Sequence, residues 1–124
     1  MRVDYGIGKS SEDYLETMIM LQEENKVVRS VDIATHLGVT KPSVSNAMKR
    51  LREEGYIDMD RSGKITLTPK GLEIAEKTYR KHKLLTEVFI KLGVDPKIAE
   101  EDACRIEHDI SDETFNALCE HIEL

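Results

Sequence analysis

The chain has 124 residues, of which 40% are hydrophobic and 34% charged, and it contains no Trp. This length suits one compact domain or two small ones and excludes a large enzyme. No apolar run reaches the roughly 18 residues that a membrane span requires, and the N-terminus lacks the apolar segment of a signal peptide. We therefore expect a soluble, cytoplasmic protein.

Charge is unevenly distributed along the sequence. The formal net charge is −6, yet residues 26–83 hold thirteen Lys and Arg against seven Asp and Glu, while residues 1–25 and 84–124 are acidic. A basic segment can contact phosphates even in an anionic chain, and clustered carboxylates can bind cations. Solvated surface is the competing interpretation of each cluster.

The first predicted helix begins at Ser10 or Ser11, where a hydroxyl can cap it, and runs to about Glu24. Its apolar residues follow helical spacing and form one stripe. Asp13 and Glu16 lie together on another part of its surface, where the core does not need them. A role outside the core is therefore open to both.

Two short helices follow. A helix from about Ser30 to Leu37 ends at Gly38, which suits the left-handed turn that closes a helix. Thr40 then caps a second helix, with Pro42 in its first turn, where proline is tolerated. Because this second helix has an apolar inner face and a polar, basic outer face, the pattern predicts a helix-turn-helix.

Residues 56–60 and 65–68 are β-rich runs that flank a turn at 61–64, so we expect a hairpin that serves as a wing. Polar and basic side chains on the second helix and at the wing tip are suited to base edges and phosphates. The residues that we expect to contact DNA are Thr40, Lys41, Pro42, Ser43, Ser45, Asn46, Lys49, Arg50, Arg61 and Lys64.

The C-terminal half is predicted to be helical. One long helix runs from about Pro69 to Leu92, and a further helix follows Asp95, which can cap it, and extends through His108. Ser111 caps a last helix. The fold class is mainly α, with a winged helix-turn-helix DNA-binding domain at 1–70 and a helical domain at 71–124, in which 71–92 is the linking helix.

The helix that ends near His108 carries three metal-binding side chain types. Cys104, Glu107 and His108 are spaced i, i+3 and i+4, so on a helix they project from one face. A thiolate, a carboxylate and an imidazole bind first-row transition metals. Three ligands do not complete a site, so the rest must come from elsewhere in the chain.

These elements, in this order, resemble the metal-dependent repressors of the diphtheria toxin repressor and manganese transport regulator type. The resemblance covers roughly residues 10–124. It rests on the stretches EDYLE (12–16), VDIA (31–34), VTKPSVS (39–45), LTPKG (67–71), RKH (80–82), ACRIEH (103–108) and SD (111–112). It implies a metal site formed by the first helix, the linking helix and the Cys/Glu/His helix, with the ligands Asp13, Glu16, His82, Cys104, Glu107 and His108.

The sequence combines features of two branches of that family. Asp13 and Glu16 are like the manganese branch, whereas Cys104 is like the iron branch and replaces a bridging carboxylate. Thr86, one turn beyond His82, stands where the iron branch has an acidic ancillary ligand. The number of ions per protomer, and whether Glu16 and His82 both ligate, therefore stay open. We expect Mn(II) or Fe(II), with Zn(II) or Co(II) as alternatives, since a ligand set alone does not fix the metal.

The resemblance implies a metal-activated repressor that binds palindromic operator DNA as a homodimer and controls genes of metal-ion homeostasis. No membrane or small organic substrate is expected as a partner. The sequence ends at Leu124, which corresponds to the two-domain form without an SH3-like domain. The apolar residues that we expect at the dimer interface are Ile106, Ile110, Phe115, Leu118 and Ile122.

Two other functions compete with this interpretation. A small hydrolytic metalloenzyme would need an open coordination position, a general base and a substrate cleft, for which this chain offers little. A winged-helix regulator could instead sense oxidants through Cys104 without a metal. Metal-dependent DNA binding that survives Cys104→Ser would argue against the latter.

Overall fold

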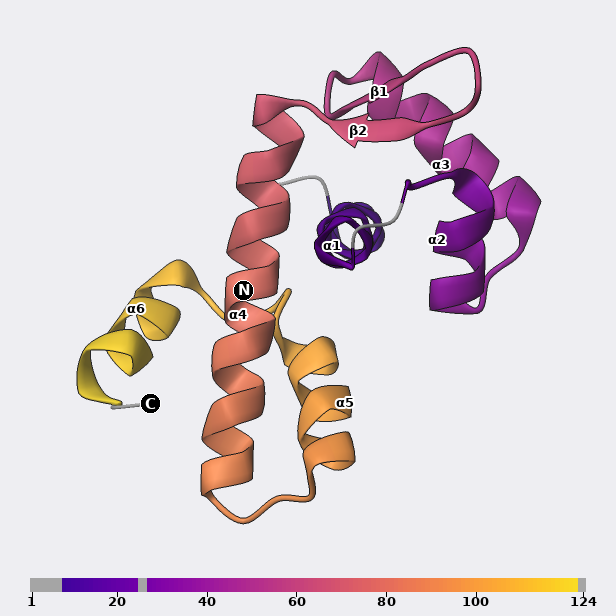
Figure 1. Ribbon diagram of the computed structural model, residues 1–124. Coiled ribbons are helices and arrows are strands. Elements are labelled where there is room, and N and C mark those ends of the chain that lie inside the picture. Colours follow the sequence, from indigo (N-terminus) through magenta and orange to yellow (C-terminus); the bar gives the residue numbers. More distant parts are fainter. Residues whose placement is uncertain (1–7, 25–26, 123–124) are drawn as a thin grey trace. The chain divides into compact units, whose positions relative to one another are not determined.

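The structure, a computed structural model, describes residues 8–24 and 27–122 (Figure 1). The chain folds as two compact units, and the division between Glu76 and Lys77 falls inside a long helix. No helix in these two described ranges is long and apolar enough to cross a membrane. The expected division at residues 70 and 71 stays a prediction.

The first unit contains a helix-turn-helix followed by a two-stranded wing. Its elements are α1 (Lys9–Glu23), α2 (Ser30–Leu37), α3 (Lys41–Glu53), β1 (Ile57–Met59), β2 (Ile65–Leu67) and the beginning of α4 (Pro69–Lys91). The two strands are antiparallel, and Asp58 lies opposite Thr66. The mainly helical, winged helix-turn-helix fold class is therefore confirmed.

The turn between α2 and α3 forms as the sequence predicts. Gly38 closes α2 in the left-handed conformation, with φ 68°, and the backbone N–H of Val39 donates to the carbonyl of Ala34 at 3.1 Å. The hydroxyl of Thr40 then accepts from the backbone N–H of Ser43 at 3.3 Å and caps α3. These two residues set where one helix ends and the next begins.

The predicted cap of the first helix is wrong by two or three residues. Helix α1 begins at Lys9 with Gly8 at the cap position, and no side chain caps it. The first intrahelical bond runs from the Glu12 N–H to the Gly8 carbonyl at 3.1 Å. Ser11 is buried inside the helix, so its hydroxyl does not serve as the cap. The serines before the acidic residues therefore predicted the region in which the helix begins, but not the residue that occupies the cap position.

The core of the first unit is assembled from all of its elements. Helix α3 contributes four buried apolar residues at helical spacing, which leaves its opposite face polar and exposed. Each strand adds one buried isoleucine. The buried residues of this core are Leu15, Met18, Leu21, Val28, Ile33, Ala34, Val44, Ala47, Met48, Leu51, Ile57, Ile65 and Ala75.

The stretch 67–71 joins the wing to α4 through a close backbone contact. A Cβ placed on Gly71 would lie 2.0 Å from the carbonyl oxygen of Tyr56, so only glycine fits there. The hydroxyl of Thr68 donates to the Gly55 carbonyl at 2.7 Å and accepts from the Gly71 N–H at 3.2 Å. Lys70 donates to the Glu54 carbonyl at 3.0 Å. This stretch therefore ties the start of α4 to the end of α3.

Within residues 77–122, the second unit consists of three helices. The rest of α4 lies between α5 (Pro96–Ile106) and α6 (Asp112–His121), as Figure 1 shows. Asp95 caps α5 by accepting from the Lys97 N–H, and Ser111 caps α6 by accepting from the Thr114 N–H, both as predicted. The buried apolar side chains of this unit are Leu85, Ala99, Ala103 and Phe115.

Helix α5 is shorter than the sequence predicted. It ends at Ile106, with Glu107 at the C-cap and His108 in the turn that follows. Cys104 is exposed, whereas Glu107 and His108 are buried. Glu107 still has helical backbone angles, with φ −60° and ψ −27°, so Cys104 and Glu107 stay about one turn apart on the same side of α5.

Candidate DNA interface and metal centre

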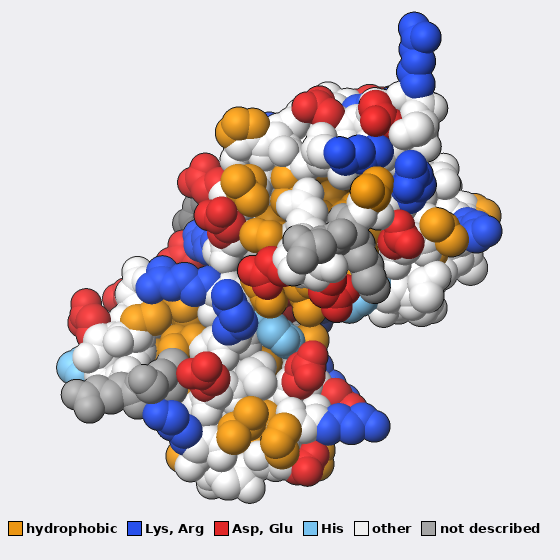
Figure 2. Space-filling model, in the orientation of Figure 1, with side chains coloured by type: hydrophobic (Ala, Val, Ile, Leu, Met, Phe, Trp, Pro, Cys, Tyr) orange, Lys and Arg blue, Asp and Glu red, His pale blue; other side chains and the backbone are white. Residues whose placement is uncertain are grey.

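The ten residues predicted to contact DNA are all exposed in the first unit. Eight of them lie on α3 or at its cap, on the side opposite the four buried apolar residues, and two lie at the wing tip. Figure 2 shows Lys and Arg side chains standing out from the surface of this unit. The hydroxyl of Thr40 is used in the cap and bonds the Ser43 hydroxyl at 2.9 Å. Its methyl group is the part of this side chain left for a base.

The wing tip is held by a local network. Asp60 accepts from the Ser62 hydroxyl at 2.7 Å, from the Ser62 N–H at 2.9 Å and from the Lys64 N–H at 3.0 Å. These bonds, with that of the Ser62 hydroxyl as the largest cause, lower the pKa of Asp60. Arg29, at the start of α2, donates to the Ser62 carbonyl at 3.3 Å. The wing is thereby linked to the helix-turn-helix.

Three consecutive residues of α4 connect it to the other elements of the second unit. Arg80 lies over the Phe115 ring of α6, with 5.4 Å from Cζ to the centroid. Lys81 is buried and donates to the Ile110 carbonyl at 3.1 Å, and it pairs with Asp112 at 3.1 Å. His82 points toward α5. Because successive helical residues are rotated by about 100°, one stretch can contact three places.

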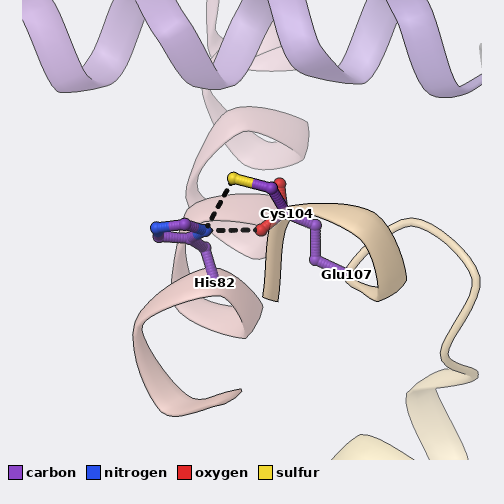
Figure 3. Close-up of side chains that lie close together, drawn as sticks. All are labelled: His82, Cys104 and Glu107. Atoms are coloured by element: carbon purple, nitrogen blue, oxygen red, sulfur yellow. Dashed lines mark hydrogen bonds and ion pairs between the residues drawn. The ribbon is translucent and has the colours of Figure 1, made fainter. Parts of the chain in front are cut away.

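His82, Cys104 and Glu107 form a compact cluster of metal-binding atoms (Figure 3). Nδ1 of His82 lies 2.8 Å from Oε2 of Glu107 and 3.6 Å from Sγ of Cys104. One donor atom from each of the three residues lies within 4.8 Å of the others. The imidazole comes from α4, whereas the thiol and the carboxylate come from the end of α5.

The cluster is buried on one side and open on the other. Glu107 is 1% exposed and His82 is 6% exposed, whereas Cys104 is exposed. Oε1 of Glu107 has no hydrogen-bond partner among the residues described, although Nε2 of His108 lies 3.4 Å away. Hydrogen bonds to Cys104 and Glu107 raise the pKa of His82 to about 10. Without a metal, the ring therefore holds a proton between two acceptors.

These residues fit a divalent transition metal. A buried carboxylate oxygen without a hydrogen bond is costly, and a bound cation would satisfy it. Thiolate, imidazole and carboxylate together suit Fe(II), Co(II) and Zn(II), and the nitrogen and oxygen donors also suit Mn(II). His82, Cys104 and Glu107 are thus residues of the second unit that could hold the ion.

The remaining predicted ligands are not part of that cluster. His108 adjoins it through Glu107, as described above. Asp13 and Glu16 lie on α1 in the first unit, one turn of helix apart, and their role as ligands stays a prediction. Thr86 donates its hydroxyl to the His82 carbonyl at 2.7 Å, one turn back in the same helix.

Two residues near the cluster were missed from the sequence. Lys81 was given no role of its own, because a lysine on a long helix is normally solvated. Glu100 had one: with Cys104 and Glu107 it forms an i, i+4, i+7 stripe on α5. Oε1 of Glu100 lies 3.9 Å from Nε2 of His82, the ring nitrogen on the side away from Glu107.

The fold and the cluster define a winged-helix protein with a helical unit equipped for a metal. The chain matches two family models, the iron-dependent repressor N-terminal DNA-binding domain over residues 7–64 and the iron-dependent repressor metal-binding and dimerisation domain over residues 68–123. The chain belongs to this family of transcriptional repressors, which includes the manganese regulator MntR and the diphtheria toxin repressor, and which is not a family of enzymes.

Individual proteins support that membership. An uncharacterised HTH-type transcriptional regulator of Methanocaldococcus jannaschii is 37% identical over 90% of this chain and 91% of its own length. The transcriptional regulator MntR of Salmonella typhimurium is 38% identical over 86% of this chain and 68% of its own length. A solved manganese-dependent transcriptional repressor in complex with manganese is 28% identical, with a TM-score of 0.80, over 87% of this chain and 50% of that chain.

Proposed function

We propose that this protein is a metal-activated transcriptional repressor that binds palindromic operator DNA as a homodimer and controls genes of metal-ion homeostasis. The observation that carries the proposal is the His82, Cys104 and Glu107 cluster, which lies in a unit of the metal-binding type, on a chain whose other unit exposes a helix-turn-helix. Because a repressor of this kind acts where the DNA is, we propose that it works in the cytoplasm.

The ion would be held by His82, Cys104 and Glu107, with His108 beside them and with Asp13 and Glu16 as further ligands on the resemblance alone. When bound, it supplies positive charge among carboxylates that otherwise repel one another. To bind the ion, His82 and Glu107 would have to give up the hydrogen bond between them, and the His82 ring would have to release a proton. If residues of α1 also bind the ion, the mobility of the DNA-binding unit would depend on whether the ion is bound.

The DNA-reading surface is the exposed face of α3 together with the wing. We propose that Thr40, Pro42, Ser43 and Asn46 contact base edges or thymine methyl groups. Lys41, Lys49, Arg50, Arg61 and Lys64 supply the salt-dependent contacts to phosphates. Two such surfaces in a dimer would read two half-sites about one helical turn apart.

The dimer would use exposed apolar side chains of the second unit. Phe115 is buried within the protomer, so of the five predicted residues it is the one least available to a partner, whereas Ile106 is 38% exposed. Figure 2 shows apolar side chains at the surface of this unit. Ile90, Leu92 and Ile98 are exposed as well, at 41%, 75% and 51%. We add these three residues to the proposed interface, because exposed apolar side chains on a unit that matches a dimerisation domain can be buried by a second copy of the chain.

The physiological ion is proposed to be Mn(II) or Fe(II). Carboxylate and imidazole ligands suit both ions, whereas the Cys104 thiolate shifts preference toward Fe(II), Co(II) and Zn(II). Which of these ions occupies the site in the cell depends on their availability there, and not on their affinity alone.

The test is binding of the chain to a pool of random and promoter-derived duplexes at fixed salt, with Mn(II), Fe(II) or Zn(II) and with a chelator. We expect tight, chelator-reversible binding to a palindromic sequence with at least one ion. Metal-independent binding to the same sequences would overturn the proposal. Cys104→Ser and Cys119→Ser form a matched pair, of which only the former should lower the metal affinity. DNA binding that needs no metal, and that peroxide abolishes in wild type but not in Cys104→Ser, would favour an oxidant sensor instead.

A further inference from the structure

The His82 ring has two nitrogen atoms, and the structure places a different acidic residue on each side. Nδ1 faces Oε2 of Glu107 at 2.8 Å and Sγ of Cys104 at 3.6 Å. Nε2 faces Oε1 of Glu100 at 3.9 Å. The ring stacks on Tyr79, with centroids 6.5 Å apart and an interplanar angle of 21°. Its two edges are therefore contacted by α5 while one face is held by α4.

This arrangement assigns different tasks to the two nitrogens. Nδ1 is the atom that shares its surroundings with the thiol and the buried carboxylate, so it is the donor that an ion in the cluster would use. A neutral imidazole that ligates through Nδ1 must carry its remaining proton on Nε2. That N–H points to the side of Glu100.

We propose that Glu100 is a positioning residue of the metal site: its carboxylate accepts the Nε2–H of His82 and thereby fixes the tautomer that offers Nδ1 to the ion. The inference rests on the proposed function, since it concerns the same site. At 3.9 Å the contact is an ion pair rather than a hydrogen bond. The Glu100 side chain is 61% exposed, so a change of rotamer can shorten the contact without moving the helix.

The spacing on α5 supports this role. Glu100, Cys104 and Glu107 stand at i, i+4 and i+7, so one stripe of the helix and its C-cap presents a carboxylate, a thiol and a second carboxylate to His82. Metal-ligating histidines commonly donate their second N–H to a carboxylate, which also raises the basicity of the ligand. Glu101, the next residue, is exposed and offers a matched carboxylate on the same helix.

The test uses the full chain and Co(II), whose bond to a thiolate gives an absorption band that reports occupancy next to Cys104. Four proteins are titrated at pH 7 without oxygen: wild type, Glu100→Ala, Glu100→Gln and Glu101→Gln. We expect Glu100→Ala to weaken Co(II) binding about 10–100-fold, the usual loss for such a partner. Glu100→Gln keeps an acceptor oxygen and should stay within about threefold of wild type, as should Glu101→Gln.

A second readout separates positioning from charge. In the Zn(II) complex, long-range ¹H–¹⁵N correlations of the ring report which nitrogen of His82 carries the proton. We expect Nε2–H in wild type and in Glu100→Gln, and faster exchange of this proton with water in Glu100→Ala. Equal Co(II) affinity of all four proteins, equal losses in Glu100→Gln and Glu100→Ala, or a proton on Nδ1 would each overturn the inference. If wild type itself bound no Co(II), both the proposed function and this inference would fail. If wild type bound Co(II) and Glu100→Ala bound it equally well, only the inference would fail.

Discussion

Nδ1 of His82 lies 2.8 Å from Oε2 of Glu107, although 25 residues of sequence separate the two. Hydrogen bonds to Cys104 and Glu107 raise the pKa of His82 from 6.5 to about 10. Without metal, the His82 ring of the folded protein therefore stays cationic above pH 6.5, whereas in the unfolded chain it has lost its second proton. The protonated ring stabilises the fold fully below pH 6.5, and this stabilisation is lost as the pH rises toward 10.

We expect the free energy of unfolding of the metal-free protein to decrease between pH 6.5 and pH 10. The contribution of His82 to this decrease is at most about 1.4 kcal/mol per pH unit. Urea unfolding of the chelator-treated protein measures it. The variant His82→Gln should lose stability at pH 6.5 and show a flatter pH dependence. Parallel curves for the two proteins would mean that His82 is not the group that titrates.

Lys81 positions the turn that carries Glu107 and His108. It donates to the Ile110 carbonyl and pairs with Asp112, and it is buried. Lys81→Met keeps the apolar stem but leaves the carbonyl without its donor, at a cost of about 1–3 kcal/mol. We expect lower stability and weaker metal binding, measured by thermal unfolding and by Co(II) titration. Lys97→Met, at an exposed position of α5, is the matched control and should change neither.

Gly71 should not tolerate a methyl group. Because a Cβ there would lie 2.0 Å from the Tyr56 carbonyl oxygen, Gly71→Ala must displace the backbone between the wing and α4. A loss of roughly 2–3 kcal/mol is expected from such overpacking, and chemical denaturation measures it. Glu73→Ala, at an exposed position two residues further along α4, should be nearly neutral. Unchanged stability of Gly71→Ala would mean that the junction is not as tight as the structure has it.

Asn46 and Lys49 should contribute to DNA binding in different ways. Asn46→Ala is expected to lower affinity for the selected operator by about 1–3 kcal/mol and to relax the preference at one base pair, with little change in salt dependence. Lys49→Gln should weaken binding to all duplexes and reduce the slope of log affinity against log salt by about one. Fluorescence anisotropy over a salt series distinguishes the two, and identical behaviour of both variants would contradict the assignment.

Much of the fold could be predicted because local chemistry decides it. Gly38, Thr40, Asp95 and Ser111 end or cap their helices as expected, since each side chain or backbone conformation acts within a few residues. The start of α1 was predicted wrongly, because two serines precede the acidic residues and the sequence alone does not show which residue occupies the cap position.

The site was less predictable, because its contacts join distant parts of the chain. Cys104 and Glu107 were found from helical spacing, whereas His82 was implied only by the family resemblance, since spacing cannot bring residues 22 or 25 positions apart together. Lys81 became visible only once its hydrogen-bond partners were known.

The coupling between metal and DNA decides whether this protein is the regulator proposed here. The measurement is the affinity of the chain for Mn(II) or Fe(II) in the absence and in the presence of saturating operator duplex, at fixed salt and pH. Linkage requires that the operator tighten metal binding by the same factor by which the metal tightens operator binding, and about 5–150-fold is expected. An affinity for the ion that is unchanged by the operator would show that the metal does not activate DNA binding.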